Sequence, residues 1–296
     1  MKISELTKEQ EVVYDLFIEQ LKQFDHDGLV KKLCRGYDLE FAYKQFCLDV
    51  KYNSDDQFAK RLFYYGNKAK SFWKFQCNRP YGINEVSDKV FSLIFKEFYQ
   101  ILQKASVNTQ TDKYIAKNSR WFAFFSNKSN QEIFLKTVKL YNDSERLIIR
   151  NYYFSIIHQL NESNFNDSSV LISSTTNENE ANKFSGGSKG IKIFFWQPNL
   201  KKKRPVFKDL PIFNGNPYEN QHEIPVFGVI FPNYIYKFTH NGETYLNPAI
   251  FKLTDFEIAM FTGLPVDNED IDTKKNDETI YKSIVTDNPD GSLFTN

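Results

Sequence analysis

Four hydroxyl side chains follow one another from Ser173 to Thr176, directly behind the apolar run 170–172. A short run of β-branched and apolar residues bounded by polar ones is typical of a buried strand. Thr175, with Glu178 three residues later, matches the capping box that begins a helix. One helix cap needs only one hydroxyl, so the pattern leaves the others available for a catalytic surface at the end of the strand.

An amide and a carboxylate stand two residues apart at Gln221 and Glu223, at the entry to the apolar stretch 224–231. Residues two apart on an extended segment point to the same side, so both side chains would face one pocket. By itself, a glutamate at a strand entry is more often solvated than catalytic. A third short motif, Arg35-Gly36, ends a segment whose apolar residues predict a short strand.

These motifs, in chain order, resemble the three signatures of the toxin-type mono-ADP-ribosyltransferases of the Arg-Ser-Glu class: Arg35-Gly36, Ile172–Thr176 and Gln221–Glu223. The residues after the hydroxyl block also resemble that family, in which a helix with Ala and Phe commonly follows, here Ala181 and Phe184. The resemblance is close over about residues 165–255 and looser over 29–37.

The resemblance implies an enzyme that cleaves nicotinamide from NAD and transfers ADP-ribose, with NAD as its substrate and no metal. Cleavage builds positive charge on the ribose, which the Glu223 carboxylate would stabilise. Arg35 would hold the phosphates of the dinucleotide as an always-charged fork, and Ser174 would orient Glu223 through a hydrogen bond. Three further residues would contribute to NAD binding: Gly36, Ser173 and Thr175.

The acceptor of the ADP-ribose is expected to be a macromolecule. By the resemblance, a Gln at position 221 goes with a weak nucleophile, such as an Asn side chain of a Rho-type GTPase or the exocyclic amine of guanine. Phe213 and Tyr218, in the preceding loop, would recognise this acceptor. The basic run Lys201–Arg204 keeps a nucleic-acid acceptor open beside a protein one, although such a run is usually a solvated loop.

The arginine of the first signature has alternatives in the sequence. The separation between Arg35 and Ser174 is long for the family, so the helical segment between them would have to be an insertion. Arg120 precedes an aromatic stretch that is compatible with a strand, which makes it the second candidate. Arg150 lies within a helical pattern of apolar residues, and we expect it to be a solvated helix residue.

The composition is typical of a globular protein, and its net charge predicts no strong overall electrostatic field. The chain has 296 residues, 41% hydrophobic, and a formal net charge of +1. No run of about 18 apolar residues and no signal-peptide profile occur, so we expect a soluble, cytoplasmic protein without a membrane partner; delivery into another cell stays open. The three cysteines and four scattered histidines lack metal-ligand spacing, which disfavours zinc, a disulfide framework and a Cys/His pair.

The order of the elements predicts an α+β fold, and the resemblance implies the split β-sandwich of the ADP-ribosyltransferases for its β-rich part. Thr7 and Gln10 form a capping box ahead of a first helix, residues 38–160 are mostly helical, and Asn241-Gly242 predicts a hairpin. We therefore expect three parts. Residues 1–164 would form a mostly helical region with a first strand at 29–37, residues 165–266 a β-rich catalytic core, and residues 267–296 a polar tail.

A competing class of function is a non-enzymatic interaction protein, in which the helical region is a recognition module and the β-rich part a scaffold. Release of nicotinamide from NAD separates the two classes. Transferases of this kind serve as toxins, defence proteins or delivered effectors, and the sequence is compatible with each of these settings.

Overall fold

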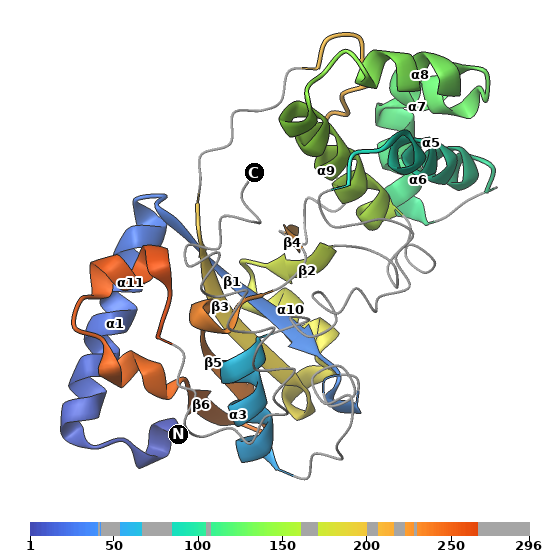
Figure 1. Ribbon diagram of the computed structural model, residues 1–296. Coiled ribbons are helices and arrows are strands. Elements are labelled where there is room, and N and C mark those ends of the chain that lie inside the picture. The colour runs from blue at the N-terminus through green and yellow to red at the C-terminus, as the bar shows by residue number, and fades with distance from the viewer. Residues whose placement is uncertain are drawn as a thin grey trace. The chain divides into compact units, whose positions relative to one another are not determined.

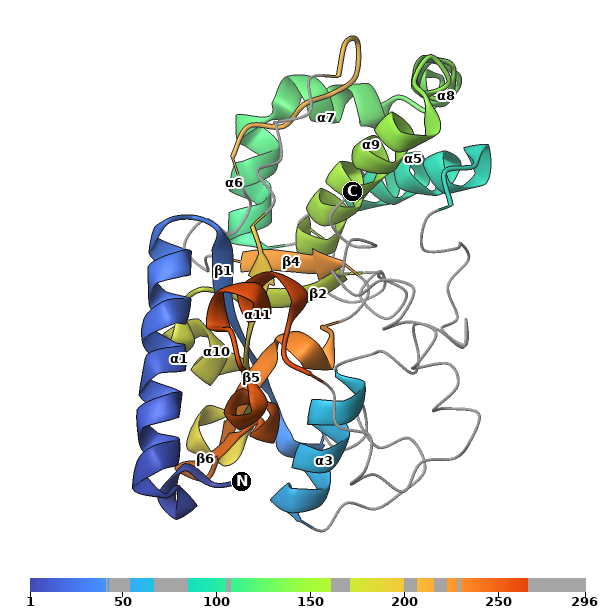
Figure 2. The ribbon, with the colours of Figure 1, turned by 60° about the vertical axis from the view of Figure 1, so that its left-hand side comes forward.

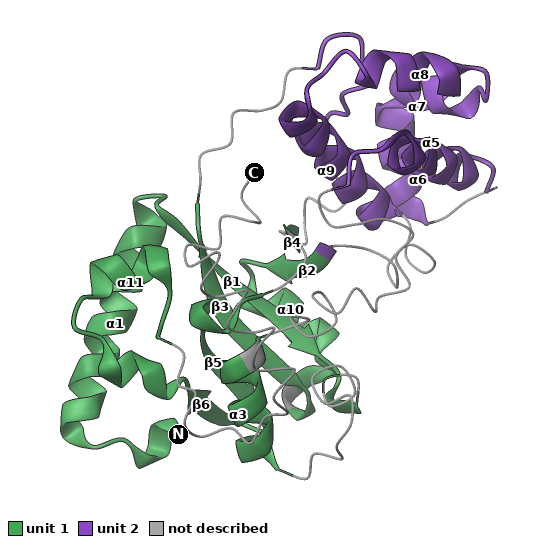
Figure 3. Cartoon of the chain, in the orientation of Figure 1, with its two compact units in different colours: residues 1–76, 172–201, 221–295 green, residues 77–171, 202–220, 296 purple. Residues whose placement is uncertain are grey.

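The computed structural model describes residues 1–40, 42, 54–66, 85–104, 108–160, 171–199, 207–215, 223–227 and 230–265. Its contacts divide the chain into two compact units (Figure 3). Unit 1 contains residues 1–76, 172–201 and 221–295, and unit 2 contains residues 77–171 and 202–220. No helix in the described part of the chain is both long enough and apolar enough to cross a bilayer.

Unit 1 is built on a six-stranded sheet of order β4-β2-β1-β3-β5-β6 (Figure 1). Its strands are β1 (Val30–Tyr37), β2 (Leu171–Thr175), β3 (Ile191–Pro198), β4 (Glu223–Phe227), β5 (Ile235–His240) and β6 (Glu243–Leu246). β1 pairs antiparallel with both β2 and β3, and β3, β5 and β6 continue the antiparallel pattern. β1 and β3 confirm the strands predicted within 29–37 and 191–196, and β2 confirms the strand predicted at 170–172 from Leu171 onward, since Val170 lies outside the described residues.

The helices of unit 1 are α1 (Lys8–His26), α3 (Asp55–Tyr65), α10 (Glu178–Phe184) and α11 (Phe256–Thr262), with short 3-10 turns at Ile3–Glu5, Gly187–Lys189, Pro232–Tyr234 and Pro248–Lys252. The capping box predicted for the first helix is present: Gln10 N donates to Thr7 Oγ1 at 3.3 Å, and Thr7 N donates to Gln10 Oε1 at 3.0 Å. These bonds satisfy two of the backbone donors that a helix start leaves unpaired.

Helices cover both faces of the sheet. Phe58 and Leu62 of α3 join a buried cluster with Ile193 and Phe195 of β3 and with other strand residues. The next residue of β3, Trp196, points to the opposite face, as the alternation of a strand requires, and contacts Phe17 of α1 at 5.7 Å between ring centroids. Figure 2 shows α1 and α3 on opposite sides of the strands.

The predicted hairpin is confirmed between β5 and β6. His240 and Glu243 are paired, and the two residues between them have positive φ, 50° at Asn241 and 80° at Gly242. Two positive φ angles are what a type I′ turn needs, and Asn-Gly supplies them at little steric cost.

Unit 2 is helical. It contains α5 (Asp88–Leu102), α6 (Thr109–Lys117), α7 (Ser119–Ser126), α8 (Asn130–Val138) and α9 (Asp143–Leu160), together with the described segment 207–215. Its core is aromatic: Phe98 stacks on Phe125 at 4.4 Å and on Phe213 at 5.5 Å between ring centroids. This agrees with the predicted helical character of residues 38–160 at 85–104 and 108–160, the part that the structure describes in unit 2.

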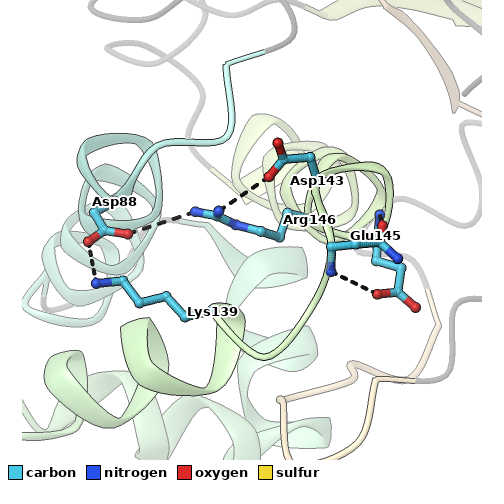
Figure 4. A network of polar contacts seen from close by, with 6 residues as sticks. Asp88, Lys139, Asp143, Glu145 and Arg146 are labelled. Carbon is cyan, nitrogen blue, oxygen red and sulfur yellow. Dashed lines mark hydrogen bonds and ion pairs between the residues drawn. The ribbon is translucent and has the colours of Figure 1, made fainter.

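A polar network on unit 2 joins the starts of α5 and α9 (Figure 4). Asp88 pairs with Lys139 at 2.6 Å and with Arg146 at 3.8 Å, and Arg146 also reaches Asp143 at 3.4 Å. Glu145 accepts from the backbone N–H of Asn142 at 3.0 Å just before α9 begins. Exposed pairs of this kind contribute little individually, but they neutralise the acidic residues at these helix starts.

The structure has the predicted α+β character, but its units do not follow the expected division at residues 164 and 266. The two units interleave along the chain. The reason is the pairing of Val30 with Pro198 and of Tyr37 with Ile191, which places the N-terminal segment in the same sheet as later strands. The expected tail, 267–296, lies outside the described residues.

Candidate active site

Three adjacent strands carry the predicted catalytic motifs. The sheet order places β4 beside β2 and β2 beside β1, so the strands that hold Glu223, the hydroxyl block and Arg35 are neighbours (Figure 1). Cys34 is paired with Thr175 across β1 and β2. Three motifs that are far apart in the sequence therefore meet at one end of the sheet of unit 1.

Glu223 is the first residue of β4 and is half-buried. Its burial raises the pKa of the carboxyl group above the ordinary value, while a hydrogen bond with the Ser173 side chain and the positive charge of Arg35 act in the opposite direction. Burial penalises the charged form, and the two polar neighbours restore part of its stability. The carboxyl group of Glu223 therefore has a hydroxyl partner in Ser173 and lies within the electrostatic influence of Arg35.

Arg35 is fixed by its own strand and by β2. Its Nη1 donates to the carbonyl oxygen of Ser173 at 2.5 Å, and its guanidinium lies 4.7 Å from the centre of the Tyr37 ring. Nε is buried without a hydrogen-bond partner among the described residues. An arginine is always charged and has five N–H donors, so donors of Arg35 remain to bind an anion.

The contact expected between Ser174 and Glu223 is made by Ser173 instead. We predicted that Ser174 orients Glu223, but the side chain that hydrogen-bonds this carboxyl group is Ser173. Ser174, which is buried, donates instead to the carbonyl oxygen of Ile224. Successive residues of a strand point to opposite faces, so only one of two adjacent serines can reach a given carboxylate. Ser174 therefore connects β2 to β4.

Thr175 does not cap the following helix as predicted. The N-cap of α10 is Asn177, whose side chain accepts from Asn179 N, whereas Thr175 Oγ1 accepts from Asn177 N at 2.9 Å. The β2 strand extends through Thr175, which displaces the helix start to Glu178. The hydroxyl of Thr175 thus forms the turn between β2 and α10.

Gly36 has a packing role that the sequence did not reveal. A Cβ atom built on it would lie 1.9 Å from the carbonyl oxygen of Ala181, because the backbone of α10 crosses β1 at this point. Ala181 is buried in this contact, whereas Phe184, which we also matched to the family's helix, is 61% exposed. In the Arg-Gly pair, Arg35 therefore supplies a charged side chain, and the next position has no room for any side chain.

The two alternative arginines lie in unit 2, and the expectations for both are corrected. Arg120 is in helix α7 and not in a strand. Arg150 is not solvated: it is 1% exposed, donates to the carbonyl oxygen of Glu85 at 3.0 Å and bonds the Asn151 side chain. A buried guanidinium needs such partners, which explains its position in the helical core. Arg35 is the arginine whose charge acts on Glu223.

The residues predicted to recognise the acceptor are placed only in part. Phe213 is 6% exposed and packs among the aromatic rings of unit 2, so it does not form a recognition surface. A phenylalanine in a polar loop can supply core area to a neighbouring helix cluster, which the loop composition alone does not indicate. Gln221, Tyr218 and Lys201–Arg204 lie outside the described residues.

Sequence reasoning missed Tyr37. Its ring is buried and supports the Arg35 guanidinium from two positions along the same strand. An aromatic residue at this spacing lies on the same face as the arginine, so the Arg-x-Tyr pattern was the available signal. The described residues contain no group of His, Cys, Asp and Glu that could hold a metal ion.

No protein-family model, curated protein or solved structure matches this chain. The chemistry of the site therefore rests on the contacts of Arg35, Ser173 and Glu223.

Proposed function

We propose that the chain is an NAD-dependent mono-ADP-ribosyltransferase, with unit 1 as a catalytic core related to the split β-sandwich of that family. The observation that carries this proposal is the meeting of Arg35, Ser173 and Glu223 on three adjacent strands. Each residue has the type that cleavage of a dinucleotide requires, and each is held by a contact to another member of the group.

We assign each residue a role that its contacts support. The Glu223 carboxylate would lie beneath the ribose and stabilise the positive charge that develops as nicotinamide leaves, an electrostatic effect worth several kcal/mol in a preorganised site. Ser173 would keep this carboxylate in position through their hydrogen bond. Arg35, anchored by Ser173 O and Tyr37, would direct its remaining donors at the phosphates of NAD.

Transfer would follow cleavage. The sequence places Gln221 two residues before Glu223, where its neutral amide would orient an acceptor amide or exocyclic amine. An amide supplies hydrogen bonds but no charge, so we assign Gln221 to the positioning of the acceptor and not to cleavage. The acceptor is a macromolecule of protein or nucleic acid.

The test is nicotinamide release by the full chain incubated with NAD. Glu223→Gln keeps the size and one acceptor atom of the side chain but removes the charge, so release should fall on the order of a hundredfold or more. Glu243→Gln, a matched change at an exposed residue of β6, should leave release unchanged.

Two results would contradict the proposal. Equal release by wild type and Glu223→Gln, both folded by circular dichroism, would remove Glu223 from the chemistry. Absence of any release by the wild-type protein, with or without a cell lysate as a source of acceptor, would favour the non-enzymatic class.

A further inference from the structure

Helix α5 and the turn before α8 form a groove on unit 2, called here the basic groove. It encloses about 500 Å³, within the range of small binding clefts. Three lysines line it, Lys89 and Lys96 from α5 and Lys128 from the turn, and all three are exposed. The two α5 lysines are seven residues apart, which is two helical turns, so they lie on one face of the helix.

The described surroundings of the basic groove offset its positive charge only in part. None of the described residues that line it is Asp or Glu. Asp88, beside Lys89, is already paired with Lys139 and Arg146 (Figure 4), and Glu132, close to Lys128 in sequence, is paired with Lys136 at 2.7 Å.

Neither Lys89 nor Lys128 forms an ion pair within the part of the chain that the structure describes. Glu97 attracts Lys96, but it does not line the groove and is itself shared with Lys104. The groove therefore carries an excess of positive charge.

The floor of the basic groove is apolar. Val90 is buried, and Leu93 and Tyr99 are half-buried with part of their surface open to the groove. An apolar floor under a rim of lysines matches a ligand that has apolar side chains and carboxylates within a few residues of each other. The described lining includes lysines but no arginine, so it does not offer the forked geometry that favours phosphates.

We propose that the basic groove docks a segment of a partner protein in which apolar side chains alternate with carboxylates. Apolar anchors would occupy the floor over Leu93 and Tyr99, and the carboxylates would meet the lysine rim, in the manner of other peptide-in-groove interactions. The proposal does not depend on the NAD chemistry, because every residue that lines the groove belongs to unit 2.

The test measures fluorescence anisotropy of a short labelled peptide of leucines among glutamates, titrated with the full chain. We expect saturable binding that weakens as salt is added. Replacement of Lys89, Lys96 and Lys128 together by alanine should weaken it about tenfold, which corresponds to about 1.4 kcal/mol. Leu93→Ala should weaken it without changing its salt dependence.

The matched control replaces three other lysines of unit 2 by alanine: Lys113, Lys117 and Lys208. This control has the same net charge as the groove variant but keeps the three groove lysines. It should therefore bind the peptide like the wild type. A charge swap adds a gain of function: with the groove lysines changed to glutamate, a peptide of leucines among lysines should bind in place of the acidic one.

Three outcomes would overturn the proposal. Equal weakening by the control variant would mean that net charge, and not the groove, attracts the peptide. Equal binding of a peptide with serines in place of the leucines would exclude the apolar floor. Tighter binding of single-stranded oligo(dT) through the same three lysines would assign the groove to nucleic acid.

Discussion

Glu223 combines two opposing requirements at the scale of a single residue. It is buried enough to have a raised pKa, yet the proposed chemistry needs it ionised. Ser173 and Arg35 offset part of the burial cost. Such a balance between stability and function is common where a charged group is held for catalysis.

The raised pKa predicts opposite pH dependences of stability and activity. The folded state holds the Glu223 proton more tightly than the unfolded chain, so the stability due to this group is present below its ordinary pKa of 4.5 and is lost as pH rises through the folded value. Nicotinamide release should increase over the same window. We expect the free energy of unfolding of the wild type, relative to Glu223→Gln, to fall as pH rises above 4.5 and through the raised pKa of Glu223, while kcat/KM rises. Parallel trends would contradict this assignment.

The two serines should give distinct phenotypes. Ser173→Ala removes a hydrogen bond that lowers the pKa of Glu223, so the acidic limb of the kcat/KM profile should move to higher pH and activity should fall about tenfold. Ser174→Ala leaves the Ile224 carbonyl without its donor, so it should cost about 1–2 kcal/mol in unfolding free energy with no shift of the profile. A shifted profile in the Ser174 variant only would reverse the two roles.

The residue types of the site were predictable from the sequence, but their contacts were not. Arg35 and Glu223 were identified because their motifs, in chain order and near predicted strands, resemble those of a known family. The choice between Ser173 and Ser174 depends on how β2 is aligned with β4. These two strands are about 50 residues apart in the sequence, so their register is not visible locally. The burial of Arg150 was missed because a single arginine in an apolar helical pattern also fits an exposed position.

At the scale of elements, Gly36 shows how packing constrains the site. The backbone of α10 passes so close to β1 that no side chain fits at this position. This contact fixes the helix that follows the hydroxyl block against the strand that carries Arg35. The position of α10 therefore depends on Gly36, the residue that directly follows Arg35.

Gly36→Ala should destabilise unit 1 by about 1–3 kcal/mol, because its Cβ would overlap the Ala181 carbonyl and force a backbone shift. Gly28→Ala is the comparison: it has open space, and its cost comes only from its φ of +71°. Thermal and urea unfolding measure both. An unchanged unfolding free energy for Gly36→Ala, together with weaker NAD binding, would assign Gly36 to the ligand and not to packing.

Most elements were predictable because their signals are local. The capping box at Thr7, the Asn241-Gly242 turn and the strand at 191–196 each depend on neighbouring residues, and all three are present. The segment at 120–125 was open to two interpretations since its aromatic residues favour strands, but packing against α5 selects a helix. Tertiary contacts of this kind are not visible in a short window.

At the scale of the whole molecule, the sequence did not reveal that the units interleave. A change of composition near residue 165 indicated a boundary there, whereas the sheet combines strands from both sides of the helical segment. Pairing between distant strands leaves no mark in local periodicity. The consequence is that the helices α5 to α9 of unit 2 pack mainly on near neighbours in the sequence, whereas the strands of unit 1 pair across very long separations.

This difference predicts the order of folding. The helices α5 to α9 are consecutive, whereas β1 pairs with β3 across a separation of well over a hundred residues, as for Val30 with Pro198. Closing so long a loop costs entropy before any contact is gained, so local helical contacts form in about microseconds to milliseconds and distant strand pairs in about milliseconds to seconds. Pulse-labelling hydrogen exchange during refolding should therefore protect the amides of α5, α7 and α9 before those of β1 and β3.

Two core substitutions should separate the phases. Phe98→Leu, in the aromatic core of unit 2, should delay the early phase, whereas Phe195→Leu, in the core of unit 1, should affect only the late one. Simultaneous protection of strands and helices in the wild type would show that loop closure does not delay formation of the sheet. It would contradict the predicted order.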